Sequence, residues 1–207
     1  MNDILSISVF EKTQKNLSIF KNTNSLINGS RYLMSTKPDD IMLKIYGANE
    51  INSWSTISSL NLLFSIKDVI IKDLEEHNLL MEWNKSEWKK KVEEDELLKV
   101  LREIRNHNIH IEVWNNPVKN YRVKIGNKAL DNFQEVDLGH HVFFKPIDFS
   151  NMKKLRNIEK YGAINSQDIE WFNRQSSMYS AGGLICEARE RYAYYISEFI
   201  NEEIQNK

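Results

Sequence analysis

A run of apolar residues at helical spacing in the middle of the chain constrains the fold more than any other feature. Within residues 96–110 the apolar residues that recur at this spacing are Leu97, Val100, Leu101 and Ile104. At roughly 100° per residue they fall within one narrow arc, the stripe that an amphipathic helix buries against its neighbours. Asn106 and His110 then project from the opposite side. The segment is predicted to be a helix with a buried and a polar face.

The polar face of this helix carries residue types that suit phosphodiester chemistry. Arg102 lies near Asn106 and His110, and Arg105 lies on the flank. With an unperturbed pKa of roughly 6.5, an imidazole can take a proton from a hydroxyl or give one to a leaving oxygen near neutral pH. A guanidinium offers fixed donors to a phosphate that gains charge in the transition state. If the nucleophile is the ribose 2′-OH, no metal is required, and RNA but not DNA is cleaved, leaving a cyclic phosphate.

The spacing by itself does not identify a catalytic pair, because it occurs twice. Arg102 and His107 stand at the same separation as Arg105 and His110. A chain with eight arginines and five histidines contains this spacing by chance roughly once in five cases. The structural alternatives are a solvated imidazole near a helix C-terminus for His110 and pairing with Glu103, one turn earlier, for His107.

The segment Leu-Arg-Glu-Ile-Arg-Asn-His-Asn-Ile-His, residues 101–110, resembles the signature of HEPN domains. In that signature an arginine, often followed by a polar residue such as Asn, precedes a histidine by four to six positions late in a helix. Arg105-Asn106 with His110 matches it, and Arg102-Glu103 with His107 matches it less well. The specific match covers about residues 96–112. Glu112 stands where part of the family carries a tyrosine that a partner antitoxin nucleotidylates, which puts that regulation in doubt.

The resemblance implies a helical bundle that forms a two-fold homodimer, with the motifs of both chains meeting in one cleft. Family members are commonly metal-independent endoribonucleases of toxin–antitoxin, abortive-infection and other antiviral systems. By this resemblance Arg105 binds the scissile phosphate, His110 acts as general acid or base, and Asn106 orients one of them. Arg102 and His107 are the expected substrate-binding residues. The implied partners are RNA, a second copy of the chain, and an antitoxin or sensor protein; no cofactor is expected.

One geometric difficulty accompanies this assignment. Arg105 and His110 are about 140° apart on an ideal helix. Either the arginine wraps around, the helix breaks before the histidine, or each residue works with its counterpart on the other chain. The sequence leaves these three alternatives open.

Length and charge are those of an ordinary globular protein. The 207 residues fit one domain, and the net charge of −1 gives no bulk attraction to nucleic acid, so any RNA contact requires a local cationic patch. The single cysteine, Cys186, fits a reducing cytoplasm and is expected to be a packed residue. No signal peptide and no run of roughly 20 apolar residues is recognised. We expect a cytoplasmic protein that does not contact a membrane.

Helices are expected on both sides of the motif. We predict a helix within residues 1–35, a turn at 35–40, one long helix over 49–76 and a break near His77-Asn78. A further helix is predicted to start at Ser86 and to run without interruption to the motif. After the β-rich segment we expect a short helix at 152–160 and a long helical stretch over 166–204, interrupted at Ala181-Gly182-Gly183.

The apolar period changes from helical to alternating at Ile109. We predict a strand from Ile109 to Val113, a turn at residues 115–117, a second strand around residues 121–125 and a third near 136–144. His110 then lies at a helix-to-strand junction, and whether the motif helix continues through it is open. His140 and His141 are neighbours in this last strand and point to opposite faces, so no metal site is expected there. The prediction is a single HEPN-like helical domain over 1–207, mainly α, with a β-hairpin insertion at about 109–146.

The lysine run, the tryptophans and the charged residues of the last helix are expected to stabilise the fold more than to bind a ligand. Residues 89–91 are three lysines followed at once by acidic residues, which favours i to i+4 pairing over a phosphate patch. The tryptophans at 83, 88, 114 and 171 suit a core better than base stacking. Glu187 and Arg191 are a predicted helical pair, although Arg189 or Arg191 can line the cleft if the last helix packs there. The competing hypotheses are a non-catalytic HEPN-like RNA-binding or assembly module and an unrelated helical protein.

Overall fold

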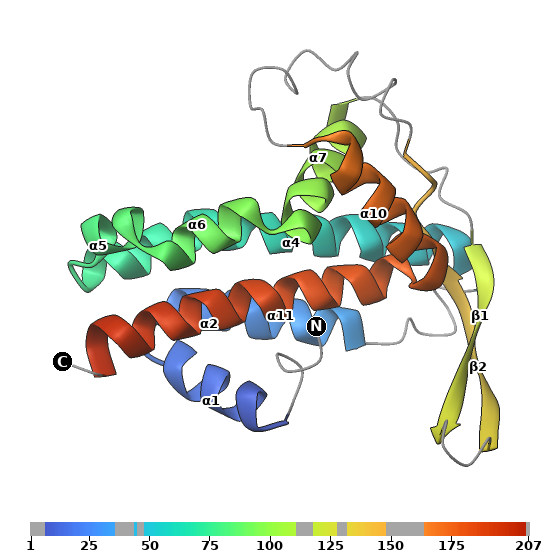
Figure 1. Cartoon of the computed structure of the whole chain (residues 1–207), viewed down its shortest axis with the longest axis horizontal. Helices are drawn as coiled ribbons and strands as arrows, with labels where there is room; N and C mark the ends of the chain where they lie inside the picture. Colours follow the sequence, from blue (N-terminus) through green and yellow to red (C-terminus); the bar gives the residue numbers. More distant parts are fainter. Residues whose placement is uncertain are drawn as a thin grey trace.

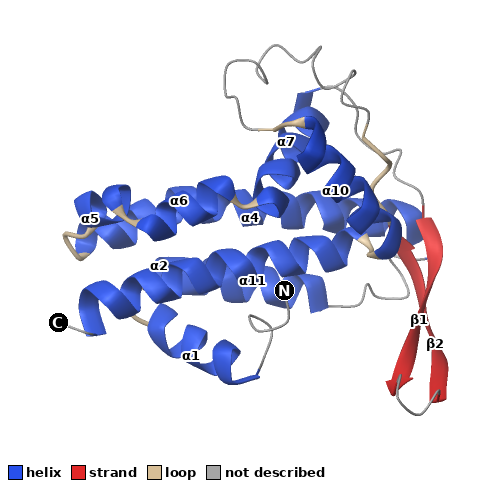
Figure 2. Ribbon diagram, viewed as in Figure 1, coloured by secondary structure: helices blue, strands red, loops and turns tan. Residues whose placement is uncertain are grey.

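A computed structural model shows a mainly helical protein with a small antiparallel sheet (Figures 1 and 2). The structure describes residues 7–35, 44, 48–110, 118–127, 132–147 and 164–205; at several of these positions, among them 33–35, 48–53, 107–110 and 123–127, only the backbone is described. Long helices form a bundle, and the hairpin extends from one end of it (Figure 1). The predicted turn at 35–40, apart from Ser35 at the end of a helix, the strand and turn residues 111–117, and the helix at 152–160 lie outside the described residues.

The N-terminal part consists of α1 (Ile7–Leu17), α2 (Lys21–Ser35) and the long α4 (Ala48–Glu76). The helix predicted over 49–76 is confirmed, and the one predicted within 1–35 is two helices. The buried Asp73 of α4 accepts hydrogen bonds from the backbone N–H groups of Asn22 and Thr23, at 3.2 and 2.7 Å. A carboxylate there satisfies unpaired N–H groups in the first turn of α2. This contact anchors α2 on α4.

The segment before and through the motif forms α5 (Leu80–Lys85), α6 (Glu87–Glu94) and α7 (Glu96–His110). The predicted cap at Ser86 is confirmed, since its side chain accepts from the N–H of Lys89. The prediction of one uninterrupted helix from Ser86 to the motif is wrong. Asp95, with φ −59° and ψ 119°, ends α6, and its side chain binds the backbone N–H of Leu98 in α7. An aspartate competes with helix continuation by this kind of local bond.

The hairpin consists of β1 (Val118–Asn127) and β2 (Asn132–Val142), paired antiparallel. A hairpin after the motif helix is confirmed, but its strands are the second and third predicted ones. Of the two possibilities open at His110, the continued helix is the correct one: α7 includes Ile109 and His110, so no strand starts at Ile109. The register shifts between Asn120 and Arg122, opposite Gly139 with its positive φ of 82°. An alternation of a few apolar residues does not distinguish a last helical turn from a strand.

The C-terminal part consists of α10 (Ser166–Met178), α11 (Ala181–Ile200) and a π-helical turn η2 (Asn201–Gln205). The helical stretch is interrupted as predicted, but the interruption is at Tyr179-Ser180, directly before the predicted Ala181-Gly182-Gly183. Ser180 caps α11 by accepting from the N–H of Gly183, so both glycines belong to the first turn of α11. A serine cap satisfies an N–H that the helix start leaves unpaired.

One hydrophobic core joins these elements. The largest fully buried side chains come from α1, α2, α4, α7, α10, α11 and the α1–α2 turn, and include Leu17, Phe20, Ile27, Leu63, Ile70, Leu97, Phe172 and Phe199. Fully burying one such side chain contributes about 1.5–3 kcal/mol. Among the described residues, none of the helices combines the length and apolar character needed to cross a membrane.

Candidate functional site

The start of the motif helix α7 is fixed by Asp95. Its Oδ1 accepts from the backbone N–H of Leu98 at 3.0 Å, while its Oδ2 accepts from Nη1 of Arg191 at 3.1 Å and from the hydroxyl of Tyr195 at 2.9 Å. The Asp95 side chain is only 3% exposed. A carboxylate so deeply buried needs charged or hydrogen-bonding partners. Here the partners are in α7 itself and in α11, so the three bonds fix the two helices relative to each other.

The apolar face of α7 is buried as predicted. The residues of the stripe, all buried, are Leu97, Val100, Leu101 and Ile104. On the adjacent side of the helix, Lys99 Nζ lies 3.1 Å from Oδ2 of the buried Asp168 in α10. Asp168 also belongs to the capping box of α10, with Asn165. α7 is therefore held against α4, α10 and α11 along most of its length, and its last turn carries the motif.

Arg105 is bound by two neutral amide oxygens. Its Nε donates to Oδ1 of Asn61 in α4 at 3.3 Å, and its Nη1 donates to Oδ1 of Asn106 at 3.3 Å. Both residues of α7 are partly buried. In the part of the chain that the structure describes, no carboxylate forms an ion pair with Arg105. Its positive charge is thus oriented there without being neutralised, which is what a phosphate-binding arginine requires.

Arg102 occupies a different environment, one turn before Arg105. It is partly buried, and its charge acts on Glu103 and on Tyr192 of α11. Burial raises the pKa of the Glu103 carboxyl above its ordinary value, and the nearby Arg102 guanidinium opposes that rise. Burial likewise raises the pKa of the Tyr192 hydroxyl strongly, against the influence of Arg102. The charge of Arg102 therefore influences both Glu103 and Tyr192.

The two histidines of the motif follow in the same helix. The backbone is helical through His107 and His110, and their side chains lie outside what the structure describes. Of the three geometric alternatives, a helix break between Arg105 and His110 is therefore wrong. In an unbroken helix the two residues point about 140° apart. Either the arginine wraps around the helix or the residues act with their counterparts on a second chain.

The arginines of α11 are bound to carboxylates instead. Arg191 donates to Asp95 and, at 2.6 Å, to Glu187, so the predicted helical pair is confirmed. Arg189 is 6% exposed and pairs with Glu190 at 2.8 Å, and Glu190 also binds Arg31 of α2. These buried ion pairs hold α11 against α2 and α7. The expectation that Arg189 or Arg191 lines a cleft is not supported by these contacts.

The remaining aromatic and lysine residues take mostly structural roles. Trp83 is buried edge-on against Phe199, with ring centroids 5.1 Å apart. Lys89 and Lys90 pair with Glu93 and Glu94, at 2.7 and 3.9 Å, as the charge pattern predicts. Trp114 lies outside the described residues. Lys89 and Lys90 are therefore partly neutralised, which favours the predicted charge pairing over a phosphate patch.

Metal and thiol chemistry receive no positive support from the described residues. Within them, no three histidine, cysteine, aspartate or glutamate side chains gather as a metal site requires. His141 packs edge-on against Tyr121, with ring centroids 5.5 Å apart.

Burial raises the pKa of the Cys186 thiol, with Arg189 acting in the opposite direction. A raised pKa lowers the thiolate fraction, which disfavours a nucleophilic role.

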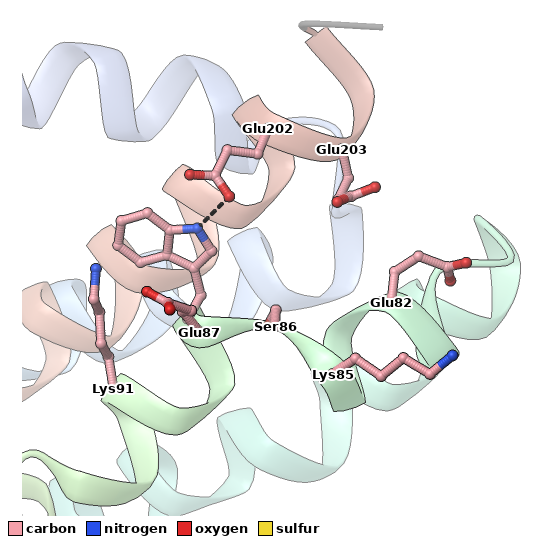
Figure 3. Close-up of a pocket in the computed structure, with 8 residues that line it drawn as sticks. Glu82, Lys85, Ser86, Glu87, Lys91, Glu202 and Glu203 are labelled. Carbon is pink, nitrogen blue, oxygen red and sulfur yellow. Dashed lines mark hydrogen bonds between the residues drawn. The ribbon is translucent and has the colours of Figure 1, made fainter.

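A pocket of about 540 Å³ lies where α5 and α6 meet the end of α11 and η2 (Figure 3). Its charged lining residues are Glu82, Glu87, Glu202 and Glu203 together with Lys85 and Lys91. The Trp88 indole N–H donates to Glu202 Oε2 at 2.7 Å, and Lys91 Nζ lies 3.7 Å from the ring centroid. Four carboxylates against two ammonium groups give the lining a net charge of −2, which repels a phosphate backbone. α5 lies at the opposite end of the bundle from the hairpin (Figure 1).

Asn61 is the residue at this site that sequence reasoning missed. It lies in α4, 44 positions before Arg105, and no local pattern connects the two. The available signal is an asparagine inside a long helix, where its intrinsic propensity is poor. That signal indicates a specific role for the side chain but does not identify its partner.

Comparison of the chain with protein-family models, with curated proteins and with solved structures finds no match in any of the three.

Proposed function

We propose that this chain is a metal-independent endoribonuclease of the HEPN type. It cleaves RNA by attack of the ribose 2′-OH on the adjacent phosphate and leaves a 2′,3′-cyclic phosphate. Arg105 binds the scissile phosphate, His110 transfers a proton, and Asn106 orients Arg105. The biological role that fits this chemistry is that of a cytoplasmic toxin or antiphage effector, with an antitoxin or sensor protein as a partner.

The observation that carries this proposal is the setting of Arg105. Its guanidinium is held by the amide oxygens of Asn61 and Asn106, both uncharged. A charge that is oriented but not neutralised stabilises the extra negative charge of a phosphorane-like transition state. The bond between Arg105 and Asn106 also supports the orienting role assigned to Asn106. The mainly helical architecture with a hairpin after α7 agrees with the family resemblance of residues 96–112.

The continuous helix favours a site shared between two chains. Because α7 is helical through His110, Arg105 and His110 of one chain diverge by about 140°. A two-fold homodimer resolves this divergence by placing the histidine of one chain beside the arginine of the other. The proposed active unit is therefore a dimer with a composite site.

The test is cleavage of a mixed structured RNA pool in excess EDTA by the purified wild-type protein. His110→Ala and Arg105→Ala are prepared identically, together with His107→Ala and Arg102→Ala for the second pair. Arg174→Ala serves as the arginine control, since Arg174 is exposed in α10. Losing the proton-transfer group lowers the rate by about 10²–10⁴-fold. We expect cyclic phosphate ends from the wild type and the control, and none from His110→Ala or Arg105→Ala.

Mixing the two inactive variants tests the composite site directly. A heterodimer of Arg105→Ala and His110→Ala contains one site with an intact arginine and an intact histidine if the site is shared. It contains none if each chain uses its own pair. Recovered cleavage on mixing supports the shared site. If all proteins are equally inert or equally active, the ribonuclease assignment fails, and RNA binding without cleavage would favour the binding-module alternative.

A further inference from the structure

Asn61 stands in the middle of α4, at the edge of the stripe that this helix buries. Its neighbours Leu60 and Leu63 are buried in the core, whereas Asn61 itself is only partly buried. Its Oδ1 accepts from Nε of Arg105 at 3.3 Å. The Ser65 hydroxyl, one turn later, donates to the backbone carbonyl of Asn61 at 2.9 Å and makes no described contact with Arg105. The side-chain amide of Asn61 therefore serves α7, not its own helix.

The two bonds to Arg105 determine which edge of the guanidinium faces outward. Asn61 occupies Nε, and Asn106 occupies one N–H of Nη1. Among the described residues, no acceptor is hydrogen-bonded to Nη2. A planar guanidinium with five N–H donors binds a phosphate in bidentate fashion through two neighbouring nitrogens. These contacts leave Nη2 and the second N–H of Nη1 as the donors for a ligand.

The neutrality of Asn61 matters as much as its position. The next acidic residue along α4 is Asp68, seven residues on, or about 10 Å along the helix axis. A carboxylate at position 61 would form an ion pair with Arg105, as Asp95 does with Arg191. It would then compete with a phosphate for the same cation. An amide accepts the hydrogen bond and leaves the charge in place.

We propose that Asn61 is a positioning residue, which holds the Arg105 guanidinium by Nε and directs its Nη1–Nη2 edge toward an RNA phosphate. This inference rests on the proposed function and adds a residue of α4 to that site. Asn61 does not touch the substrate and acts only through Arg105. The α4–α7 contact is thereby part of the site as well as of the core.

The test is a double-mutant cycle on RNA binding, with cleavage measured in addition for the variants that keep Arg105. Asn61→Ala, Asn61→Asp, Arg105→Ala and the double variant Asn61→Ala/Arg105→Ala are compared, with Ser65→Ala as the matched control on the same helix. Binding is measured by anisotropy of a fluorescein-labelled RNA oligonucleotide in the His110→Ala background. Loss of one orienting hydrogen bond is expected to lower cleavage and weaken binding about tenfold. The same substitution should have no further effect once Arg105 is absent.

The Asn61→Asp variant tests whether the uncompensated charge of Arg105 is needed. The aspartate accepts the bond from Arg105 and neutralises the guanidinium, so RNA binding is expected to weaken although the melting temperature is not lowered. Wild-type RNA binding in this stable variant would show that the free charge of Arg105 does not bind the phosphate, and it would overturn the inference. Asn61→Ala with wild-type cleavage and binding, or with equal effects in both arginine backgrounds, overturns the inference.

The same data distinguish failure of this inference from failure of the proposed function. Cleavage that is unaffected by Asn61→Ala removes the positioning role and leaves the ribonuclease assignment standing. RNA binding without any cleavage, weakened by Asn61→Ala through Arg105, removes the ribonuclease assignment and leaves the positioning role standing. A wild-type protein that neither binds nor cleaves RNA overturns both.

Discussion

Arg105 at the end of α7 and Arg191 in α11 are both partly buried, but they have opposite kinds of partner. Arg191 is bound to the carboxylates of Asp95 and Glu187. Arg105 is bound to the amide oxygens of Asn61 and Asn106. Burial of a cation is costly unless an anion compensates it, so the carboxylates at Arg191 stabilise the bundle. The amide oxygens at Arg105 leave its charge uncompensated, and an anionic ligand can bind there.

The Asp95–Arg191 pair and Arg105 lie at opposite ends of α7. Asp95, which pairs with Arg191, caps the start of α7, and Arg105 lies in its last turns. The helix is thus bound to α11 through compensated charges at its start and carries an uncompensated charge toward its end. Substitutions at the two ends should therefore affect different properties, stability at the start and ligand binding at the end.

The largest expected effect is that of Asp95→Ala. It removes the cap of α7, the acceptor of the Tyr195 hydroxyl and one of the two carboxylates at Arg191. Removing one partner of a buried ion pair costs about 3–5 kcal/mol. We expect the free energy of unfolding, measured by urea denaturation, to fall by that amount. Glu94→Ala, one residue earlier and exposed, should change it by less than about 0.5 kcal/mol; equal effects would contradict the assigned role of Asp95.

A smaller and more selective effect is expected from the arginines themselves. Arg191→Ala leaves the buried Asp95 carboxylate with fewer partners, and it should lower the free energy of unfolding by about 2–4 kcal/mol. Arg105→Ala removes two bonds to neutral groups and should lower it by less than about 1 kcal/mol. Thermal unfolding of both variants at one pH measures the difference. A larger loss for Arg105→Ala would mean that its contacts stabilise the fold as those of Arg191 do, and that the two arginines do not differ in role.

An effect smaller than those of Asp95→Ala and Arg191→Ala is expected at Glu190, the carboxylate shared by Arg31 and Arg189. Burial alone would raise the pKa of its carboxyl, but the hydrogen bonds and charges of Arg31 and Arg189 outweigh it, so the pKa lies below its ordinary value of 4.5. A lowered folded-state pKa stabilises the protein above the unfolded value, and this stability is lost as the pH falls through the folded-state pKa.

Glu190→Gln should therefore lower the free energy of unfolding at pH 7 by about 1–2 kcal/mol. The difference from the wild type should shrink steadily as the pH is lowered from 5 to about 3. Denaturation curves at a series of pH values measure it, with Glu94→Gln as an exposed control. A difference that stays constant down to pH 3 would show that the carboxylate is not held by its two arginines.

The buried face of α7 could be predicted because it depends on local periodicity. Its four stripe residues are buried, and the Ser86 cap and the Glu187–Arg191 pair follow equally local rules. The break at Asp95 was missed because the apolar period continues across it. The tertiary bonds to Arg191 and Tyr195 of α11 add to the local cap at Leu98 in favouring an extended conformation at Asp95.

The environment of each arginine could not be predicted, because it depends on contacts between distant segments. Arg105 and Asn61 are 44 positions apart, and Arg191 and Asp95 are 96 positions apart. The sequence identifies arginines on a polar helix face but does not show which of them a carboxylate neutralises. That distinction comes only from the packing of α4, α7 and α11, and it is what separates a structural arginine from a candidate ligand-binding one.

The attachment of α7 at Asp95 helps to set the direction of the helix axis, and so the position of Arg105 near its other end. Arg105 lies ten residues beyond Asp95, or about 15 Å along the helix axis. A tilt of about 4° at the capped start moves that part of the helix by about 1 Å, and a displacement of this size can change a reaction rate about a hundredfold. If the proposed function holds, a substitution that tilts α7 at Asp95 should therefore lower the cleavage rate although it lies far from Arg105 in the same helix.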